Sequence, residues 1–249
     1  MRLQFALTML FALMVTASPI TELLNRIKRQ IIQTYDVTEV IYNSNGKAVA
    51  TTILHVTTTV YPSTTLAPVP TATPTDYVST ALYHHNIHRA NHSVPLLKWD
   101  TKLVASAQVL AATCKWGHSM NINGGGYGQN IAAYGSTNAK ALGANKEMAV
   151  AATDMWYNGE QPTYLPSYYG KNNPDLTTFE QWGHFSQMVW LGTNSVGCAT
   201  QLCQPMDIWP SMPAWYTVCN YSPPGNMGGQ YGVNVFPPLR HPSVNVVNA

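Results

Sequence analysis

The sequence has few charged residues, and the two signs nearly cancel. Lys and Arg number 13 and Asp and Glu 11 in 249 residues, which gives a net charge of +2 and a charged fraction of 10%. A nucleic-acid-binding protein normally carries a clustered basic face, and a disordered chain is poor in apolar residues, whereas this chain is 45% hydrophobic. The composition therefore argues against nucleic acid as a partner and predicts a folded core.

A hydrophobic run long enough to cross a bilayer is also missing. Arg2 precedes an apolar stretch over residues 5–15, and small residues follow at positions 17 and 18. This stretch of 11 residues is shorter than the roughly 20 of a spanning helix, and its layout is that of a secretory signal peptide. We expect residues 1–17 to be a signal peptide and the mature protein to be secreted and extracellular, with no transmembrane segment.

Cysteine is scarce, and no two cysteines have the CxxC spacing of a thiolate zinc site. In an exported protein, cysteines favour disulfides over metal or redox roles. The four cysteines allow three pairings; they are Cys114, Cys198, Cys203 and Cys219.

The N-terminal third lacks the pattern of a packed domain. Lys28 and Arg29 resemble a dibasic processing site, with an exposed basic turn as an equally weighted alternative. Residues 51–75 contain no Asp, Glu, Lys or Arg and are dense in Thr and Pro. Such a composition predicts an extended, disordered spacer of the kind that carries O-glycans. Residues 18–75 are therefore read as a propeptide-like segment and linker, and the domain should begin at Asp76.

Residues 76–238 carry helical and strand patterns. Asp76 is a predicted N-cap for a helix whose buried stripe is Val78, Ala81, Leu82 and His85. Asp100 begins a second helix, with Leu103, Ala107, Leu110, Ala111 and Cys114 on one side, and a Gly-rich turn follows at 121–130. A third helix is expected at 145–157 and a short one at 184–190, followed by strands at 196–203 and 214–222. The second strand should place Trp215, Thr217, Cys219 and Tyr221 on one face. Together these elements predict an α+β domain built in layers, followed by a tail at 239–249.

Five segments of this domain resemble one known family. Residues 183–193 (GHFSQMVWLGT) and 219–226 (CNYSPPGN) resemble its two signatures, and HNIHR, GHS and WYNGE match further motifs in the same order. The domain is therefore similar to the CAP superfamily, which comprises cysteine-rich secretory proteins, antigen 5 and pathogenesis-related proteins, and most resembles secreted fungal members. The resemblance covers about residues 76–238 and implies a three-layer α/β/α sandwich.

The resemblance also implies a cleft with two histidines and two acidic residues, which binds divalent cations in some members. The matching positions are His118, Glu160 and His184, with Gln129 where the family commonly has Glu. Two imidazoles and one carboxylate could bind zinc or magnesium, but losing an anionic oxygen weakens the attraction for a dication. The alternative is a polar cluster that only stabilises the Gly-rich loop.

Enzymatic readings have less support. His84 and His88 are spaced i, i+4 but lack the Glu of a zincin motif, and we expect them to be packing residues. Ser186 follows His184 closely, but no nucleophile elbow or separate Asp–His pair supports catalysis by it. We therefore expect a non-enzymatic protein. A metal-dependent hydrolase using His118, Glu160 and His184 remains the alternative.

The loop at 161–183 is rich in aromatic residues, namely Tyr164, Tyr168, Tyr169, Phe179 and Trp182. Aromatic rings on a loop can cover an apolar ligand, and sterol binding in yeast relatives is associated with a loop of this kind. The resemblance thus implies a secreted protein that binds and carries sterols, fatty acids or related lipids. The alternatives are that these rings seal the core, or that the Thr/Pro arm makes the chain a cell-wall or host-interaction protein.

Covalent features complete the prediction. Cys198 and Cys219 lie on strands expected to be neighbours, and Cys114 ends a helix that must be tied to the sheet. We predict the pairs Cys198–Cys219 and Cys114–Cys203, which the resemblance also favours. Asn91 begins a sequon expected to carry an N-glycan, whereas the sequon at Asn220 lies in a strand signature and is expected to be buried.

Overall fold

The computed structural model describes residues 31–42, 48–60 and 69–246, and the chain divides into two units at residues 63 and 64. The predicted signal peptide and the Lys28–Arg29 site lie outside the described residues. In the N-terminal unit, β1 (Ile31–Tyr42) and β2 (Ala48–Val60) form an antiparallel pair. Residues 51–60, expected to be a disordered spacer, therefore belong to a paired strand. Their Thr, Val and Ile residues favour extended backbone, and pairing with β1 satisfies their main-chain polar groups.

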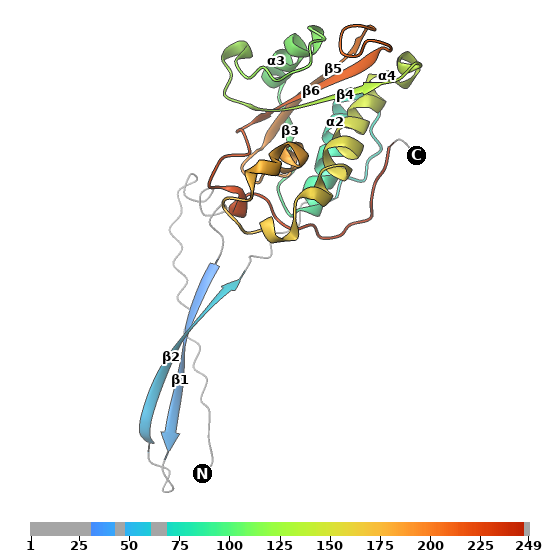
Figure 1. Cartoon of the computed structure of the whole chain (residues 1–249). Coiled ribbons are helices and arrows are strands. Elements are labelled where there is room, and N and C mark those ends of the chain that lie inside the picture. The colour runs from blue at the N-terminus through green and yellow to red at the C-terminus, as the bar shows by residue number, and fades with distance from the viewer. Residues whose placement is uncertain (1–30, 43–47, 61–68, 247–249) are drawn as a thin grey trace. The chain divides into compact units, whose positions relative to one another are not determined.

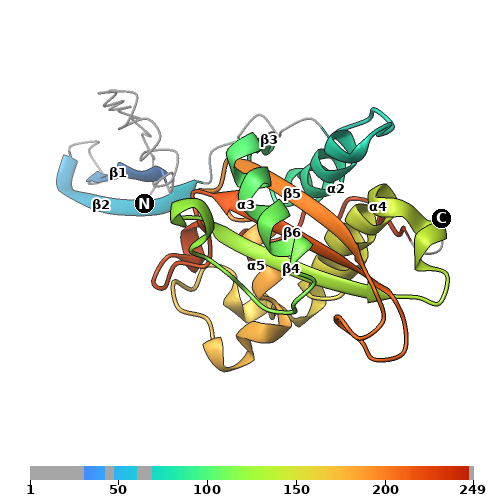
Figure 2. The same ribbon diagram turned by 90° about the horizontal axis from the view of Figure 1, so that it is seen from above.

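The C-terminal unit is a three-layer sandwich, which confirms the expected fold class. Its mixed sheet has the order β3-β5-β6-β4, in which β3 and β5 are parallel and the other neighbours antiparallel. The strands are β3 (Lys98–Trp99), β4 (Gly128–Gly135), β5 (Ser195–Cys203) and β6 (Ala214–Ser222). Helix α3 (Thr101–Ala112) covers one face, and α2 (Tyr77–Asn91) and α4 (Ala139–Ala149) lie on the other (Figures 1 and 2).

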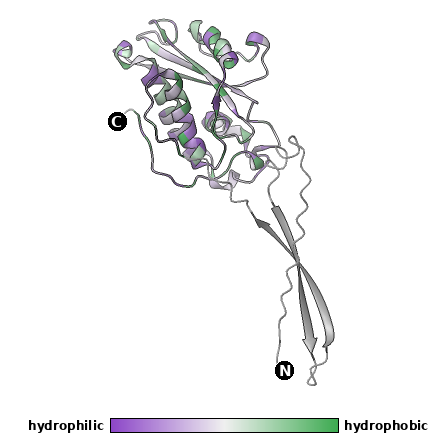
Figure 3. Cartoon of the chain, turned by 180° about the vertical axis from the view of Figure 1, so that it is seen from behind, coloured by the Kyte–Doolittle hydropathy of each residue, from purple (hydrophilic) through white to green (hydrophobic). Residues whose placement is uncertain are grey.

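The helix starts follow their local sequence. Asp76 and Ser79 form a reciprocal capping box at the start of α2, and Asp100 accepts a hydrogen bond from Lys102 N at the start of α3. The predicted buried stripe of α2 was wrong at Val78, which is 38% exposed. The helix instead buries many polar residues along with apolar ones, and its ribbon carries both hydrophilic and hydrophobic residues in Figure 3.

The third predicted helix has two parts. Helix α4 continues directly into the π-helix η2 (Val150–Asn158), which the sequence pattern did not indicate. The chain then passes through the short helices η3 (Gln161–Thr163), η4 (Pro166–Tyr168) and η5 (Leu176–Gln181) before α5 (Gly183–Met188). Two further short helices are η1 (Ile122–Gly124) and η6 (Tyr231–Val233).

The sheet differs from the prediction at β4. Residues 128–130, expected in a Gly-rich turn, begin β4 and pair with β6. In β6, Tyr216 and Val218 are as fully buried as Thr217 and Cys219, which lie on the opposite face. Both faces are buried because helices cover the sheet on each side.

Two hydrophobic clusters fill the spaces on either side of the sheet. The larger contains Met148, Trp156, Trp182 and Phe185, and the smaller packs α3 against Ile131, Tyr216 and Val218. Both predicted disulfides are present. Cys198–Cys219 joins directly paired residues of β5 and β6, and Cys114–Cys203 ties the end of α3 to the end of β5.

The C-terminal segment follows the surface of the domain. Leu239 N donates to Asn91 O, Asn158 Nδ2 donates to Val244 O, and Val246 N donates to the Asp154 carboxylate. The predicted tail is thus attached to α2 and η2 through residue 246. None of the helices in the described residues combines the length and apolar character needed to span a membrane.

Candidate functional site

His184 and Glu160 form the most directly coupled polar pair of the predicted site. His184 lies in the first turn of α5, and Glu160 follows η2. The Nδ1 atom of His184 is 2.5 Å from Glu160 Oε1, and Phe185 N donates to Oε2 at 2.9 Å. An ionised carboxylate can only accept, so Nδ1 carries the proton and Nε2 of a neutral imidazole is left with its lone pair.

Gln129 holds His118 in a similar way. Gln129 Oε1 accepts from Ser119 N at 3.0 Å and lies 3.1 Å from His118 Nδ1. Its Nε2 donates to Asn220 Oδ1 at 2.9 Å and to Ser119 O at 3.3 Å. The buried amide therefore uses both its oxygen and its nitrogen within the protein, and it orients His118 with Nε2 as the free ring nitrogen.

The arrangement fits a cation held by two imidazoles. The His118 and His184 rings lie 6.3 Å apart at an interplanar angle of 30°. Metal-binding histidines typically use their second ring nitrogen on a carboxylate or amide oxygen, which is what Glu160 and Gln129 provide here. Glu160 and Gln129 thus each contact the Nδ1 atom of one histidine in this structure, and metal binding by the four residues stays a prediction.

The described residues contain two groups of three potential ligands whose atoms all lie within 4.8 Å, and neither is the predicted set. One combines His85 with Cys198 and Cys219, and the other contains Cys114, Cys203 and Asp207. The cysteines in both groups form disulfides. Their sulfur atoms are therefore not thiolate ligands.

A cleft of about 500 Å³ opens beside the His184–Glu160 pair. Its walls come from β4, η2, the start of α5 and nearby loops. The lining residues are Trp116, Ile131, Ala132, Ala133, Met155, Trp156, Glu160, His184, Ile208 and Trp209. The Trp156 ring lies 6.1 Å from the His184 ring and is nearly parallel to it. The apolar lining is therefore directly next to the polar pair. The volume is in the range of small-molecule sites, and the lining has their usual mixture of apolar walls and few polar groups.

Sequence reasoning missed most of this lining. Trp116 follows α3, and Ile208 and Trp209 lie in the β5–β6 loop (204–213); none of the three was a predicted site residue. The sequence does contain a signal for this part of the lining. The segment QPMDIWPSMP has large apolar residues between prolines, in a connection between strands that is normally polar.

The aromatic loop is not an open ligand cover. Tyr164, Tyr168 and Trp182 are buried in the larger hydrophobic cluster, and Tyr169 and Phe179 pack against it half-buried. The Tyr164 ring contacts four others, those of Tyr168, Tyr169, Trp182 and Phe185. The rings of Tyr164, Tyr168 and Trp182 were expected to cover a ligand, but they are packed in the hydrophobic core instead. Ligand contact by Tyr169 and Phe179 stays a prediction.

The histidines of α2 form a buried network. His84 Nδ1 and His88 Nε2 lie 2.8 and 2.9 Å from Thr153 Oγ1, and His85 Nε2 lies 2.8 Å from Tyr221 OH. Burial lowers the pKa of both His84 and His85 to about 4. These imidazoles join α2 to η2 and to β6 as neutral groups.

Ser186 is also fully buried. Its Oγ donates to Asn226 Oδ1 at 2.6 Å, a bond that joins α5 to the segment after β6. Its hydroxyl is thus hydrogen-bonded away from the imidazole of His184.

The expected glycosylation of Asn91 does not agree with the folded chain. Asn91 is buried at the end of α2, where its Nδ2 donates to Tyr157 OH at 2.8 Å and its Oδ1 accepts from His241 N. A glycan on this nitrogen would displace Tyr157 OH. Asn220 is buried as predicted, and its Nδ2 donates to Leu103 O.

The fold and the site define a disulfide-linked α/β/α domain with a ligand-sized cleft beside a His–Glu pair. The chain belongs to the cysteine-rich secretory protein family, whose model matches residues 82–221. It is 48% identical over 172 residues to the "Probable pathogenesis-related protein" of Arthroderma benhamiae, a match that covers 69% of this chain and 52% of the relative. It is 35% identical over 176 residues to "Fruiting body protein SC7" of Schizophyllum commune, covering 67% and 75%.

A solved structure supports the same fold. The crystal structure of NaASP2 with Zn²⁺ superposes with a TM-score of 0.52 at 24% identity, covering 65% of this chain and 86% of that one. The matched region spans about half of the Arthroderma protein.

Proposed function

We propose that this chain is a secreted protein that binds sterols and related small lipids outside the cell, in the cleft beside His184. The observation that carries the proposal is the cleft lining, which is largely apolar and ends at one polar pair, His184 and Glu160. A sterol matches this lining, because it has a rigid apolar body with a single hydroxyl at one end. Two disulfides support an oxidising, extracellular location.

The cleft suits binding better than hydrolysis. Both oxygens of Glu160 accept hydrogen bonds, one from His184 and one from Phe185 N. This carboxylate keeps further lone pairs, so the preference for a carrier over the metal-dependent hydrolase rests on the lining. Glu160 and His184 are its only ionisable side chains, and the other lining residues are apolar or aromatic.

Direct binding to the purified full chain tests the proposal, using a radiolabelled sterol and a radiolabelled fatty acid, with and without chelator. Ala133→Phe adds a ring to the cleft wall and should weaken binding at least about tenfold, because the bound lipid and the new ring compete for the same volume. Ala112→Phe adds the same ring on the exposed side of α3 and serves as the matched control.

A folded Ala133→Phe variant that binds as tightly as the parent would show that the lipid lies elsewhere. A parent that binds neither sterol nor fatty acid would refute the carrier function and favour the cell-wall or host-interaction reading.

We further propose that His118 and His184 bind a divalent cation, with zinc preferred over magnesium. The supporting observation is that the Nδ1 atom of each ring is engaged by a side-chain oxygen, which leaves each Nε2 for a metal. Imidazole suits zinc, whereas magnesium prefers oxygen ligands.

Isothermal titration calorimetry tests this site. Zinc should give a heat of binding that His118→Ala abolishes. Acid should weaken zinc binding, because protons compete for the same ring nitrogen. No heat with either metal would exclude the site.

A further inference from the structure

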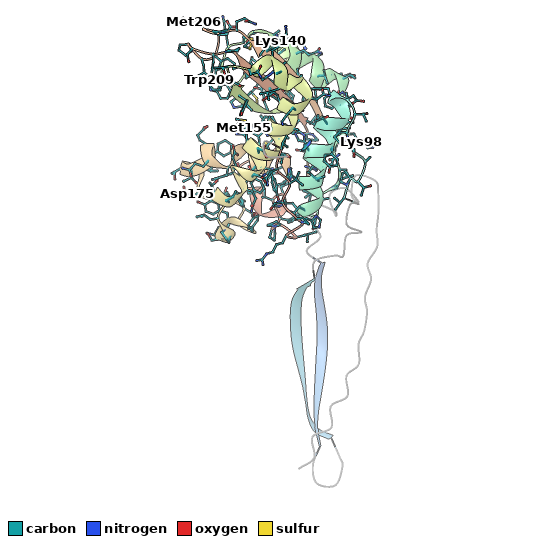
Figure 4. All side chains as sticks on the ribbon, turned by 90° about the vertical axis from the view of Figure 1, so that its right-hand side faces the viewer. Lys98, Lys140, Met155, Asp175, Met206 and Trp209 are labelled. Atoms are coloured by element: carbon teal, nitrogen blue, oxygen red, sulfur yellow. A yellow bond between two sulfur atoms is a disulfide. The ribbon has the colours of Figure 1, made fainter. Side chains whose placement is uncertain are left out.

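Large exposed apolar side chains gather at one end of the domain, beside and within the cleft lining. Met206 is 79% exposed and Trp116 is 56% exposed, and Trp209 is also exposed. Met206 and Trp209 lie together at one end of the domain in Figure 4, away from Asp175. Trp116 and Trp209 both line the mouth of the same cleft. Contiguous exposed apolar surface of this kind commonly marks an interaction site.

The structure holds these residues in place. The Cys114–Cys203 disulfide joins the segment that carries Trp116 to the start of the β5–β6 loop. Within the loop, Met206 N donates to Trp209 O at 2.8 Å, and Gln204 N donates to Asp207 Oδ2 at 2.8 Å. Met206 has a φ of 80°, a left-handed conformation that is costly for a residue other than Gly. The turn thus keeps the Met206 side chain outside the core.

Basic residues flank the apolar cluster. Lys115 precedes Trp116 and is exposed, and exposed Lys140 lies in the first turn of α4. The start of α4 is tied to the loop region, because Ser136 N donates to Pro213 O and Trp215 Nε1 donates to Ala139 O. The one acidic residue of the β5–β6 loop, Asp207, already accepts from a backbone amide.

We infer that this surface, formed by the β5–β6 loop with Trp116, Lys115 and Lys140, docks on a lipid bilayer with anionic headgroups. Tryptophan is favoured at membrane–water interfaces, and each Lys near an anionic surface adds electrostatic attraction. Docking would bring the lipid cleft next to the headgroup layer, and this role rests on the proposed function. That the surface binds a bilayer is inferred from its exposed apolar and basic residues alone.

Vesicle flotation with the purified full chain tests the inference, using phosphatidylcholine vesicles with and without phosphatidylserine. The parent should float with the phosphatidylserine vesicles, and more weakly at high salt. Met206→Asp should lower the affinity at least about tenfold, and Lys115→Gln with Lys140→Gln should do so only when phosphatidylserine is present. Leu176→Asp places the same charge at a residue that is 50% exposed on η5 and should change nothing.

Three outcomes would overturn the inference. They are a parent that floats with neither vesicle, a Met206→Asp variant that floats like the parent, and a Met206-dependent dimer with no vesicle binding, which would make the surface a self-association face. Met206 is not part of the cleft lining. Met206→Asp should therefore keep its affinity for sterol in solution, so that failure of docking and failure of lipid binding are separate results.

Discussion

Arg89 shows how one buried residue organises this domain. It is fully buried on α2, and its guanidinium donates to four backbone carbonyls, those of Pro95, Met188, Trp190 and Thr193. Burial lowers its pKa to about 9, which still leaves it charged at neutral pH. The planar fork of Arg can serve several carbonyls at once, and here it fixes α2 to the segment that follows α5.

Arg89→Met should therefore cost at least about 3 kcal/mol of unfolding free energy, because the carbonyls lose charged donors and remain buried. Urea denaturation of the variant measures this loss. Arg240→Met removes the same group from an exposed position and should change stability by less than about 0.5 kcal/mol. Equal losses in both variants would show that Arg89 does not have this role.

Gln129→Glu is the substitution that restores the residue common in the family, and we expect it to destabilise this chain. The amide nitrogen donates to Asn220 Oδ1 and Ser119 O, so a carboxylate would place an anionic oxygen against two acceptors. The cost should be roughly 1–3 kcal/mol. It should shrink in acid, where a protonated carboxyl can donate again.

Thermal unfolding at neutral and acidic pH measures the effect of Gln129→Glu, with Gln201→Glu on the exposed side of β5 as the control. A Gln129→Glu variant as stable as the parent at neutral pH would mean that Asn220 rotates its amide to supply a donor.

At the scale of elements, the segment from η3 to η5 contributes buried tyrosine rings to the core. Tyr164 is fully buried, and its hydroxyl has no hydrogen-bond partner among the described residues. Tyr164→Ala should cost about 3–5 kcal/mol, as for other large-to-small core changes. Tyr164→Phe should be neutral or stabilising, because it removes an unsatisfied buried group.

Differential scanning calorimetry of the two Tyr164 variants distinguishes a core ring from a ligand cover. If Tyr164→Ala melts like the parent, the ring is dispensable for folding and the ligand-covering role regains support.

The elements that depend on local signals were predictable from the sequence. Asp76 and Asp100 cap their helices with their own side chains, and both interactions span at most three residues. Strand β3 was not predictable, because its two residues are a strand only through pairing with β5. The same holds for the first residues of β4, because Gly128 and the three glycines at 124–126 suggest a turn, and only pairing with β6 makes Gly128 part of a strand.

At the scale of the whole molecule, buried neutral histidines make stability depend on pH. Burial lowers the pKa of His84, His85 and His92 to about 4, from an ordinary value of 6.5. Between these values the unfolded chain binds protons that the folded chain does not, so protons favour unfolding. Stability should be fully present above about pH 6.5 and should fall steadily as the pH drops towards 4.

Urea midpoints measured from pH 7 to pH 4 test this expectation. His84→Gln keeps an amide beside Thr153 without the titrating ring, and it should flatten the slope. A midpoint that is constant over this range would contradict the prediction.

The site was predictable only in part, for a physical reason. His118, Glu160 and His184 belong to short motifs that can be recognised in the sequence. The cleft, in contrast, is assembled from β4, η2, the start of α5 and loops that are distant in the chain. The roles of Glu160 and Gln129 depend on which atom faces which ring nitrogen. That information exists only after folding.

Asn91 Nδ2 is the atom that N-glycosylation would modify, and in the folded chain it donates a hydrogen bond to Tyr157 OH. A host cell that glycosylates this nitrogen before α2 packs would secrete a second species, in which the contact of Asn91 Nδ2 with Tyr157 OH is lost. Asn91→Gln would remove the sequon at the expense of that same contact. Ser93→Gly removes it while keeping Asn91, and a glycine suits the φ of 57° at this position. For recombinant production, the third residue of the sequon is therefore the one to change.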